Sequence, residues 1–375
     1  MVKNKIKVVC VAAARPNFMK IAPLLDEFKK HKEFKPILVH TGQHYDYNMS
    51  GSFFKELNIQ KPNYNLGINA GLHGEQTGRT MIEFEKVCLK EKPQLVIVVG
   101  DVNATIACAL VASKLHIPVA HIESGLRSRD MKMPEEINRI LTDHISNYLF
   151  VTCKEGKNNL INEGINKKKI FFVGDIMVDT LKKQLPKIKN EKYKSKVLKQ
   201  FDLVSKKYAL LTLHRPSNVD NKKRLKALLE TFNIIQKKIK IIYPIHPRTK
   251  KRIKEFGFEK YLKQIENFIT IPPLGYLDMI CLLNNAKFLL TDSGGLQEES
   301  TTLKIPCLTL RNNTERPVTV DVGTNIIVGA NKSKIIKEVN KILLGKGKKG
   351  KQPKYWNGNT AERIIKNLHN EIYKL

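Results

Sequence analysis

Short apolar runs alternate with amphipathic segments along this chain, and this alternation restricts the possible fold more than any other feature. The segments between the runs carry apolar residues at helical spacing. Strands that alternate with helices predict parallel sheets covered on both faces. The apolar runs of the first half are rich in β-branched residues and predict strands at 7–13, 36–41, 95–100, 118–123, 148–152 and 170–174.

The alternation restarts after a polar, lysine-rich stretch at 181–200. Two such series in 375 residues indicate two doubly wound, Rossmann-like α/β domains, 1–180 and 181–354. The last helix, 355–375, is expected to pack back on the first domain. The strands of the second series are predicted at 208–214, 240–246, 267–273, 286–292 and 305–310.

The chain is strongly basic, with 66 Lys and Arg against 35 Asp and Glu and a formal net charge of +31. Nucleic acid, membrane surfaces and anionic metabolites are therefore candidate partners. Most of the basic residues are lysines, scattered in short runs without interleaved aromatic residues. That pattern favours a solvated surface over a nucleic-acid-binding protein. Six of the few arginines stand instead at predicted strand or helix ends, where a planar guanidinium is useful: Arg15, Arg127, Arg139, Arg215, Arg248 and Arg316.

Cysteine usage and hydropathy bear on the cellular compartment. Six cysteines show no CxxC spacing and lie mostly in apolar runs, as buried thiols do in a reducing compartment. No apolar stretch approaches the roughly 20 residues of a membrane-spanning helix. The N-terminal apolar run is short and leads into a helical pattern instead of a cleavage site. These features predict a cytoplasmic protein with no membrane span.

Residues that can bind anions or transfer protons follow the predicted strands in both halves of the chain. Ligands of open α/β sheets bind beyond the carboxyl ends of the strands. We therefore expect the site in a cleft between the two domains. The strand ends carry Ala14-Arg15-Pro16-Asn17, Gly100-Asp101, Glu123-Ser124-Gly125, His214-Arg215-Pro216, His246-Pro247-Arg248 and Asp292-Ser293-Gly294-Gly295.

The stretch LLTDSGGLQEES (289–300) is the sharpest single motif. A strand, Ser-Gly-Gly and a helix place a hydroxyl and unpaired backbone N–H groups at the positive end of a helix dipole, which suits a phosphate. Glu299 could accept both hydroxyls of a ribose. A tight turn without a ligand explains the motif alone equally well. Arg15, Lys20, His214 and Arg316 would suit a diphosphate or be ordinary surface charge.

The stretch HIESGLRSRDMKMPEEINRILTDH (121–144) concentrates acids in a basic chain. Glu135 and Glu136 are explained by the first turn of a helix that begins at a proline, with Glu135 paired to Arg139. Glu123, which ends a core strand, and Asp101, which ends the strand before it, are not explained in this way. If the two strands are neighbours, these carboxylates converge, as general acid–base chemistry needs.

Two motifs argue against bound cofactors. GKGKKGK (345–351) contains a literal GxGxxG, but it follows a helix and predicts a mobile basic loop. The first strand–helix turn lacks glycine, so neither NAD nor ATP in a Walker site is expected. No HExxH or paired Cys/His spacing suggests a metal. For His246 a packed, hydrogen-bonded imidazole is as good an interpretation as a ligand contact.

Nine motifs in this order resemble the non-hydrolysing UDP-N-acetylglucosamine 2-epimerases. The resemblance implies a two-domain fold like that of B-type glycosyltransferases, UDP-sugar in the interdomain cleft, a homodimer and no redox cofactor. That family interconverts UDP-GlcNAc and UDP-ManNAc by eliminating UDP to 2-acetamidoglucal and adding it back. The motifs are RPNFMKIAPL, TGQHYDYN, VGDVNATIACAL, HIESGLRS, MPEEINRILTD, HRPSNVD, YPIHPRT, TDSGGLQEES and TERPVT.

The resemblance also implies roles for individual residues. Asp101, Glu123 and Glu135 are the acid–base candidates, with His214 beside the departing UDP. Which carboxylate serves which face of the sugar stays open. The uridine would contact Leu274 and Met279. The diphosphate and its ribose would be held by Arg15, Lys20, His214, Ser293, Gly294, Gly295, Glu299 and Arg316.

Some motifs depart from the pattern of this family. The usual HRxEN reads HRPSN, with Ser217 in place of an acid, and the usual WDGKA reads WNGNT. Some relatives bind a second UDP-GlcNAc as an activator near the residues matching Gln43 and His246. Both residues are present, but Asp46 stands where those relatives have Gln.

The rival interpretations are a 2-epimerase of a diacetamido UDP-uronic acid, a hydrolysing epimerase, a retaining glycosyltransferase and a basic nucleic-acid-binding protein. The TERPVT stretch resembles the GlcNAc branch of the family. HIESGLR lacks the pattern of the hydrolysing group. A glycosyltransferase would not need three carboxylates clustered at these strand ends.

Overall fold

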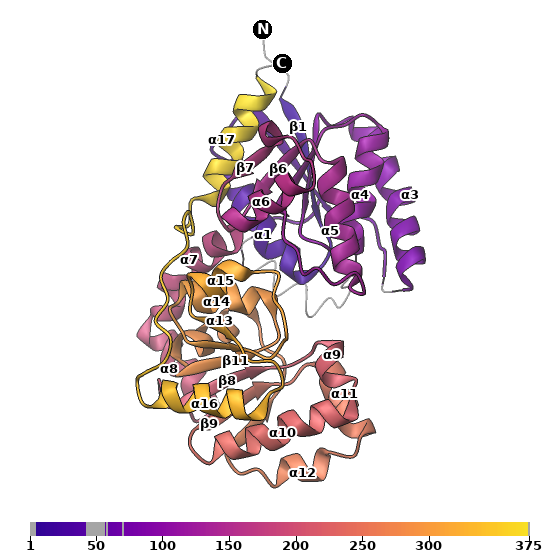
Figure 1. Ribbon diagram of the computed structural model, residues 1–375. Helices are drawn as coiled ribbons and strands as arrows, with labels where there is room; N and C mark the ends of the chain where they lie inside the picture. The colour runs from indigo at the N-terminus through magenta and orange to yellow at the C-terminus, as the bar shows by residue number, and fades with distance from the viewer. Residues whose placement is uncertain (1–4, 43–56, 58, 70, 374–375) are drawn as a thin grey trace. The chain divides into compact units, whose positions relative to one another are not determined.

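The computed structural model describes residues 5–42, 57, 59–69 and 71–373 of the chain (Figure 1). It divides into two compact units, Met1–Lys183 with Lys354–Leu375, and Gln184–Pro353. Each unit contains one parallel sheet with helices on both faces, which confirms the predicted fold class. Among the described residues, no helix is long and apolar enough to cross a membrane.

The first unit is built on a seven-stranded sheet in the order β3-β2-β1-β4-β5-β6-β7, and every neighbouring pair in it is parallel. Six of the strands match the sequence prediction closely, whereas the two-residue β3 was too short to give a pattern. The strands are β1 (Ile6–Ala12), β2 (Phe34–His40), β3 (Tyr64–Asn65), β4 (Leu95–Val99), β5 (Val119–Ser124), β6 (Tyr148–Val151) and β7 (Ile170–Phe172).

The helices of this unit form two groups. α3, α4 and α5 pack in sequence on one face of the sheet, whereas α1 packs against the C-terminal helix α17 (Figure 1). The elements are α1 (Arg15–Phe28), α3 (His73–Glu91), α4 (Asn103–Lys114), α5 (Pro134–Ile145), α6 (Lys154–Asn162), the 3-10 turn η1 (Lys167–Lys169), α7 (Ile176–Lys189), which continues into the second unit, and α17 (Thr360–Ile372).

The C-terminal segment is tied into the first unit by buried polar contacts. The indole of Trp356 is buried, and its Nε1 donates to the Thr152 carbonyl at 3.1 Å. Thr360 donates to the Asp175 carbonyl, and the Ala361 N–H donates to Asp179. The motif WNGNT, which departs from the family pattern, therefore opens a helix that belongs structurally to the N-terminal sheet.

The second unit repeats this design with six parallel strands in the order β10-β9-β8-β11-β12-β13. The three-residue β13 is the strand that the sequence did not predict. The strands are β8 (Tyr208–Thr212), β9 (Lys240–Pro244), β10 (Phe268–Ile271), β11 (Phe288–Thr291), β12 (Cys307–Thr309) and β13 (Asn325–Ile327).

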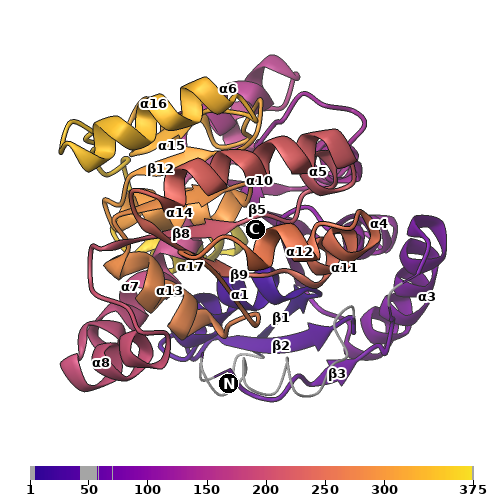
Figure 2. The same cartoon turned by 90° about the horizontal axis from the view of Figure 1, so that it is seen from below.

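Helices α10 and α16 pack against each other over one face of this sheet, and α8 packs against α13 (Figure 2). The polar stretch 181–200, expected to be a crossing segment, is mostly helical, because it holds the end of α7 and all of α8. The helices are α8 (Glu191–Gln200), α9 (Pro216–Val219), α10 (Lys222–Gln236), α11 (Pro247–Glu255), α12 (Glu259–Lys263), α13 (Tyr276–Asn285), α14 (Gly294–Thr302), α15 (Pro317–Asp321) and α16 (Lys332–Leu343).

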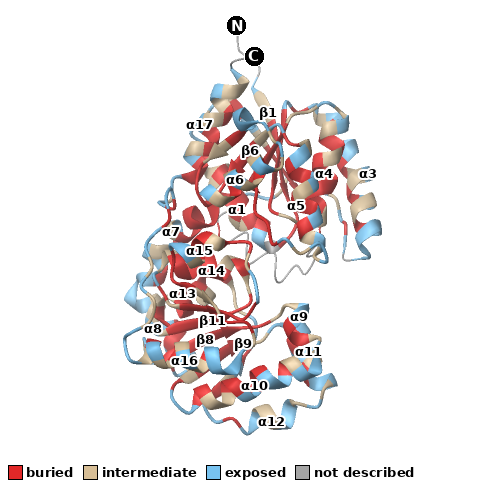
Figure 3. Ribbon diagram, in the orientation of Figure 1, coloured by how far each residue is buried: buried red, intermediate tan, exposed pale blue. Residues whose placement is uncertain are grey.

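Central strands are buried along their whole length, as Figure 3 shows. All five residues of β4 are buried, as are all five of β8. Helices on both faces explain why these strands are continuous apolar runs without alternation. Each fully buried Val, Ile or Leu contributes about 1.5–3 kcal/mol to the stability of its unit. The apolar runs of the sequence therefore form two separate hydrophobic cores, one in each unit.

Candidate active site

Both sheets reverse their strand order at one point, and several of the residues singled out at strand ends lie beside those two points. The order changes direction between β1 and β4 in the first unit and between β8 and β11 in the second. Loops that leave neighbouring strands there in opposite directions open a crevice that binds ligands in open α/β sheets. Asp101 follows β4, His214 follows β8 and Asp292 follows β11, each beside a reversal point.

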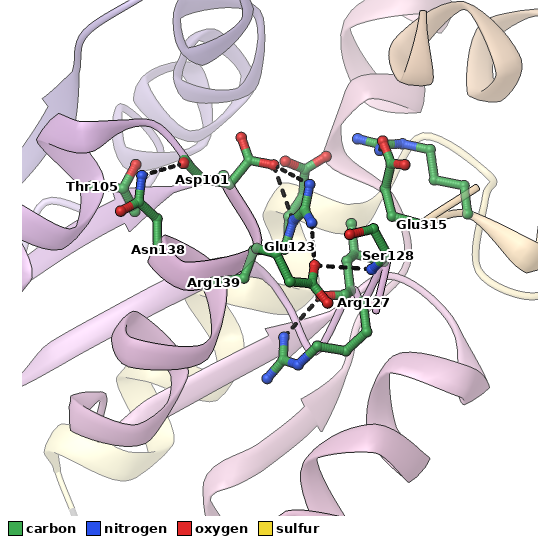
Figure 4. Close-up of polar contacts among 12 residues, drawn as sticks. Asp101, Thr105, Glu123, Arg127, Ser128, Asn138, Arg139 and Glu315 are labelled. Carbon is green, nitrogen blue, oxygen red and sulfur yellow. Dashed lines mark hydrogen bonds and ion pairs between the residues drawn. The ribbon is translucent and has the colours of Figure 1, made fainter. Parts of the chain in front are cut away.

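Asp101 is clamped by an arginine from α5. Nε and Nη2 of Arg139 lie 3.0 and 2.7 Å from Oδ2 of Asp101. Asn138 donates from its side chain to the Asp101 carbonyl at 2.9 Å (Figure 4). The Asp101 side chain keeps 29% of its surface exposed, whereas the Arg139 side chain keeps 3%. A buried guanidinium thus fixes a carboxylate that still faces solvent.

Glu123 lies at the end of the neighbouring strand β5 and is buried beside Lys20 of α1. The Lys20 ammonium forms an ion pair with Oε2 of Glu123. A Cβ placed on Gly100 would lie 3.2 Å from Lys20 Nζ and 3.4 Å from Glu123 Oε2. The pair therefore sits over the residue that precedes Asp101. The carboxyl ends of β4 and β5 bring together the two acids that the sequence singled out.

Asp175 is an acid of this region that sequence reasoning missed. It follows β7 and is fully buried, and one of its carboxylate oxygens lies within 4.8 Å of one from Glu123. Its Oδ1 accepts the Met177 N–H at 2.9 Å. The available signal was its place after the predicted strand 170–174, the same signal that pointed to Asp101 and Glu123.

Glu136 is not a surface charge, which corrects the interpretation drawn from helix-end chemistry. It is 1% exposed and accepts the backbone N–H groups of Ser128 and Arg129 at 2.9 and 2.8 Å. It also pairs with Nη1 of Arg139. Glu136 thus holds the loop before α5 and orients the arginine that clamps Asp101. The first-turn position alone could not distinguish it from Glu135, which is half-buried.

A second buried network in this unit centres on Asp143 of α5. Nδ1 of His121 is 2.7 Å from Oδ1 of Asp143, and both side chains are fully buried. Oδ2 of Asp143 accepts the Gly125 N–H at 3.0 Å and an Arg127 N–H at 2.7 Å. Burial opposes ionisation of Asp143, but the charges and hydrogen bonds of His121 and Arg127 outweigh it and lower its pKa. Asp143 is therefore a carboxylate.

His121 bridges two elements through its ring nitrogens. Nε2 lies 2.8 Å from the Gly100 carbonyl oxygen, and Nδ1 lies 2.7 Å from Oδ1 of Asp143. His121 thus ties the Gly100 carbonyl to Asp143 of α5. It supports the backbone from which Asp101 projects.

In the second unit the fully buried Asp292 organises the site. Its carboxylate accepts the N–H groups of His214 and Arg215, and the side-chain amide of Asn218 at 3.1 Å. Nδ1 of His214 lies 3.0 Å from Oδ1. Burial would raise the pKa of Asp292, but the bonds from His214, Arg215 and Asn218 outweigh burial and lower it. Asp292 thereby fixes the loop after β8 against the loop after β11.

The N-terminus of α14 has the geometry that the Ser-Gly-Gly motif predicts. Ser293 is the N-cap residue and makes no side-chain cap bond. A Cβ on Gly294 would lie 2.7 Å from Nη1 of Arg316 and 2.8 Å from Oε1 of Glu315, whereas nothing lies within 4 Å of one on Gly295. A side chain at position 294 would therefore have to displace the Arg316–Glu315 ion pair, which packs on this backbone. Arg316 is held there by ion pairs with Glu298 and Glu315.

The other predicted contacts of the second unit have varied surroundings. Glu299 is buried in α14, whereas Leu274 and Met279 are half-buried at the start of α13. The ring of His246 is exposed, lies 5.3 Å from that of His214 and accepts the Arg248 N–H as the N-cap of α11. Partial desolvation and the nearby His214 lower the pKa of His246.

Three positions named from the sequence need separate comment. Arg15 is the first residue of α1, and its side chain lies outside the described part of the structure. Gln43, the other predicted regulatory residue, lies outside the described residues altogether. Ser217, which stands where the family pattern has an acid, is exposed in the short helix α9.

Two doubly wound parallel sheets, each with charged residues at its reversal point, define a B-type-glycosyltransferase-like α/β protein. A family model described as UDP-N-acetylglucosamine 2-epimerase matches residues 26–369. The chain belongs to this family.

Individual relatives agree over almost the full length. A Methanocaldococcus jannaschii protein named UDP-N-acetylglucosamine 2-epimerase is 51% identical over 365 residues, covering 97% of this chain and 99% of that protein. A Pseudomonas aeruginosa UDP-2,3-diacetamido-2,3-dideoxy-D-glucuronate 2-epimerase is 41% identical, covering 97% and 99%. The crystal structure of the Methanocaldococcus jannaschii UDP-GlcNAc 2-epimerase with UDP-GlcNAc and UDP superposes with a TM-score of 0.89 at 50% identity, covering 97% of this chain and 100% of that one.

Proposed function

We propose that this protein is a non-hydrolysing UDP-N-acetylglucosamine 2-epimerase that interconverts UDP-GlcNAc and UDP-ManNAc. The observation that carries the proposal is the similarity, at 50% identity over 97% of the chain, to an epimerase solved with UDP-GlcNAc and UDP. The reaction inverts C2 of the sugar. Because that carbon is not adjacent to a carbonyl group, simple removal of its proton is difficult.

Elimination of UDP removes this difficulty. The C2–H bond and the C1–O bond to UDP break, a C1–C2 double bond forms, and 2-acetamidoglucal and UDP are left. Re-addition of UDP at C1 with protonation of C2 from the other face gives the epimer. This sequence needs carboxylates that take and give a proton and a cationic clamp for the departing diphosphate.

The first unit supplies the acids. We assign the proton transfers to Asp101, Glu123 and Glu135. Asp101 suits this role because the buried Arg139 orients a carboxylate that still faces solvent. Glu123 pairs with Lys20, so proton transfer and the charge of that lysine would be coupled.

The second unit supplies donors for the diphosphate. We assign this role to the N-terminus of α14 with Ser293, Gly294 and Gly295, and to His214 and Arg316. The arrangement supports the role because Asp292 and Glu298 hold His214 and Arg316 in place without a ligand. Donors held in position before the reaction stabilise developing charge at low reorganisation cost. Glu299 would accept from the ribose, with Leu274 and Met279 beside the uracil, while Arg15 would add charge near the diphosphate.

We further propose that the enzyme works in the cytoplasm as a homodimer. All six cysteines lie in described ranges and are buried free thiols. Burial raises the pKa of Cys10, Cys153 and Cys307 to about 12, so these thiols stay protonated and unreactive. Such cysteines suit a reducing compartment. The homodimer rests on the family resemblance, and light scattering of the purified chain tests it.

Proton NMR of UDP-GlcNAc with the enzyme in D2O tests the reaction. Expected are loss of the C2 proton signal through deuterium incorporation and the appearance of UDP-ManNAc. Asp101→Asn, Glu123→Gln and Glu135→Gln should each slow this exchange by about 100-fold or more. Glu83→Gln, which removes an exposed carboxylate paired with Lys86 of the same helix, is the matched control.

Three results would count against the proposal. Free ManNAc would indicate a hydrolysing enzyme, and absence of deuterium at C2 would exclude the elimination route. Faster turnover of the diacetamido uronic acid derivative, the substrate type of the 41% identical relative, would move the protein to that branch.

A further inference from the structure

The second unit has a pocket at the opposite end of its strands from His214 and Asp292. Its volume is about 500 Å³. Five lysines line it, Lys206, Lys287, Lys304, Lys348 and Lys349, together with an apolar wall and three glycines. We call it the lysine pocket. All of its residues belong to the unit Gln184–Pro353.

The lysine pocket lies at the amino ends of the strands, whereas the candidate site residues of this unit lie at the carboxyl ends. Lys206, Lys287 and Lys304 each precede a strand, β8, β11 and β12 respectively. These strands are parallel neighbours, so their amino ends meet at one edge of the sheet. His214 and Asp292 lie at the carboxyl ends of the same strands. The pocket is therefore separated from them by the length of the sheet.

The loop GKGKKGK (345–351) forms one wall of the pocket and is packed, not mobile as its composition suggested. A Cβ on Gly350 would lie 2.3 Å from the backbone carbon of Gly323, so only glycine allows this approach. The Lys351 N–H donates to the Val322 carbonyl at 2.8 Å. Lys348 donates to the Asn325 carbonyl at 3.1 Å. Gly350, the last glycine of this GxGxxG, thus seats the loop against the backbone of Gly323.

The lining of the pocket contains no aspartate or glutamate. Elsewhere on the described surface, lysines commonly pair with acids, as Lys341 does with Glu338 at 2.7 Å. Lys206 instead donates to the carbonyls of Asn284 and Ala286 at 2.7 and 3.1 Å, which fixes its ammonium at the pocket. Lysines on a merely solvated surface have mobile ammonium groups, whereas the ammonium of Lys206 is fixed by two carbonyl oxygens.

The pKa directions of Lys206 and Lys348 agree with a desolvated, positively charged site. Desolvation lowers the pKa of Lys206, and the charge of Lys287 lowers it further. Desolvation also lowers the pKa of Lys348, although Asp321, which does not line the pocket, raises it in part. Ammonium groups that repel one another, as those of Lys206 and Lys287 do, are stabilised by a ligand of multiple negative charge.

We propose that the lysine pocket binds a ligand that carries two or more phosphate groups. Lysine ammonium groups are compact point charges suited to phosphate oxygens. The volume lies within the range of small-molecule sites. The phosphates could belong to a soluble oligophosphate or to phospholipid headgroups, and Leu344, 73% exposed beside the pocket wall, would contact lipid only in the second case. This inference is independent of the epimerase activity.

Calorimetric titration with tripolyphosphate tests the soluble case. UDP is present at saturation, so that the proposed nucleotide site is filled. Lys287→Glu with Lys304→Glu reverses two charges of the pocket. The control, Lys260→Glu with Lys263→Glu, makes the same change in net charge on the exposed helix α12. We expect the pocket variant to lose affinity by about tenfold or more and the control by about twofold at most. Melting curves check that both variants fold.

Vesicle sedimentation tests the lipid case, with pure phosphatidylcholine against phosphatidylcholine containing phosphatidylglycerol. Headgroup binding predicts that the phosphatidylglycerol vesicles are bound, and that the pocket variant and Leu344→Ser are both impaired. Binding of tripolyphosphate alone identifies a soluble ligand. The proposal is overturned if pocket and control variants lose affinity equally, which would indicate overall charge, or if the wild-type chain binds neither probe. A failed epimerase assay would leave these outcomes unchanged.

Discussion

Gly294 and Gly295 provide the sharpest test of how the N-terminus of α14 is built. They are neighbours at the start of one helix, and neither has a positive φ. Replacing each by alanine adds the same single methyl group. At Gly294 that methyl would lie 2.7 Å from the guanidinium of Arg316 and 2.8 Å from the carboxylate of Glu315. At Gly295 it would meet nothing within 4 Å.

The two substitutions should therefore change stability in opposite directions. At Gly294 the methyl must displace a buried ion pair, and overpacking of this kind costs about 1–3 kcal/mol. At Gly295 the loss of unfolded-chain freedom should stabilise the protein by about 0.4–1 kcal/mol. For a domain of this size, each kcal/mol corresponds to a shift of roughly 2–4 °C in melting temperature. Differential scanning calorimetry of the ligand-free protein measures both shifts.

UDP binding then separates packing from ligand approach. If α14 holds the diphosphate, the methyl of Gly295→Ala occupies space that the ligand needs. The affinity for UDP should then fall by about tenfold, or about 1.4 kcal/mol, although the protein is no less stable. Equal melting temperatures for the two variants would refute the packing argument. Unchanged UDP affinity of Gly295→Ala would refute the phosphate role of this helix.

A further prediction concerns the first unit. Glu136→Gln should destabilise the protein by about 3 kcal/mol in chemical denaturation because it breaks a buried ion pair, whereas Glu83→Gln should cost at most about 1 kcal/mol; equal losses would show that burial of Glu136 contributes nothing.

The fold could be predicted from the sequence because its signals are local. Buried parallel strands such as β4 and β8 are apolar runs bounded by turn residues, and the helices between them have their own periodicity. The strands that escaped prediction, β3 and β13, are two and three residues long, too short for any pattern. The loop at Gly350 was predicted to be mobile from its composition, because the backbone of Gly323 that it packs against cannot be identified from the sequence.

Only those residues of the candidate site that stand at strand ends could be predicted from the sequence. Asp101 and Glu123 were found because each ends a strand. Glu136 and Asp143 were not, because their importance depends on partners distant in sequence or on burial within a helix. Glu136 bonds to Ser128 and Arg129 across a loop, and Asp143 joins His121 from another element. Long-range pairing of this kind leaves little trace in a single sequence.

The backbone of Glu123 is strained, and this strain supports the proposed role of Glu123 as an acid–base residue. Its φ of +69° lies in the left-handed region, which for a residue other than glycine costs about 1–2 kcal/mol. The same residue interrupts the pairing of β5 with β6, whose register shifts between Ile122 and Ser124. A regular strand would avoid both costs. The left-handed turn lets the buried carboxylate meet Lys20 over Gly100. Since glycine would relieve the strain but lose the carboxylate, the strained conformation is best explained by a need for an acid at this strand end.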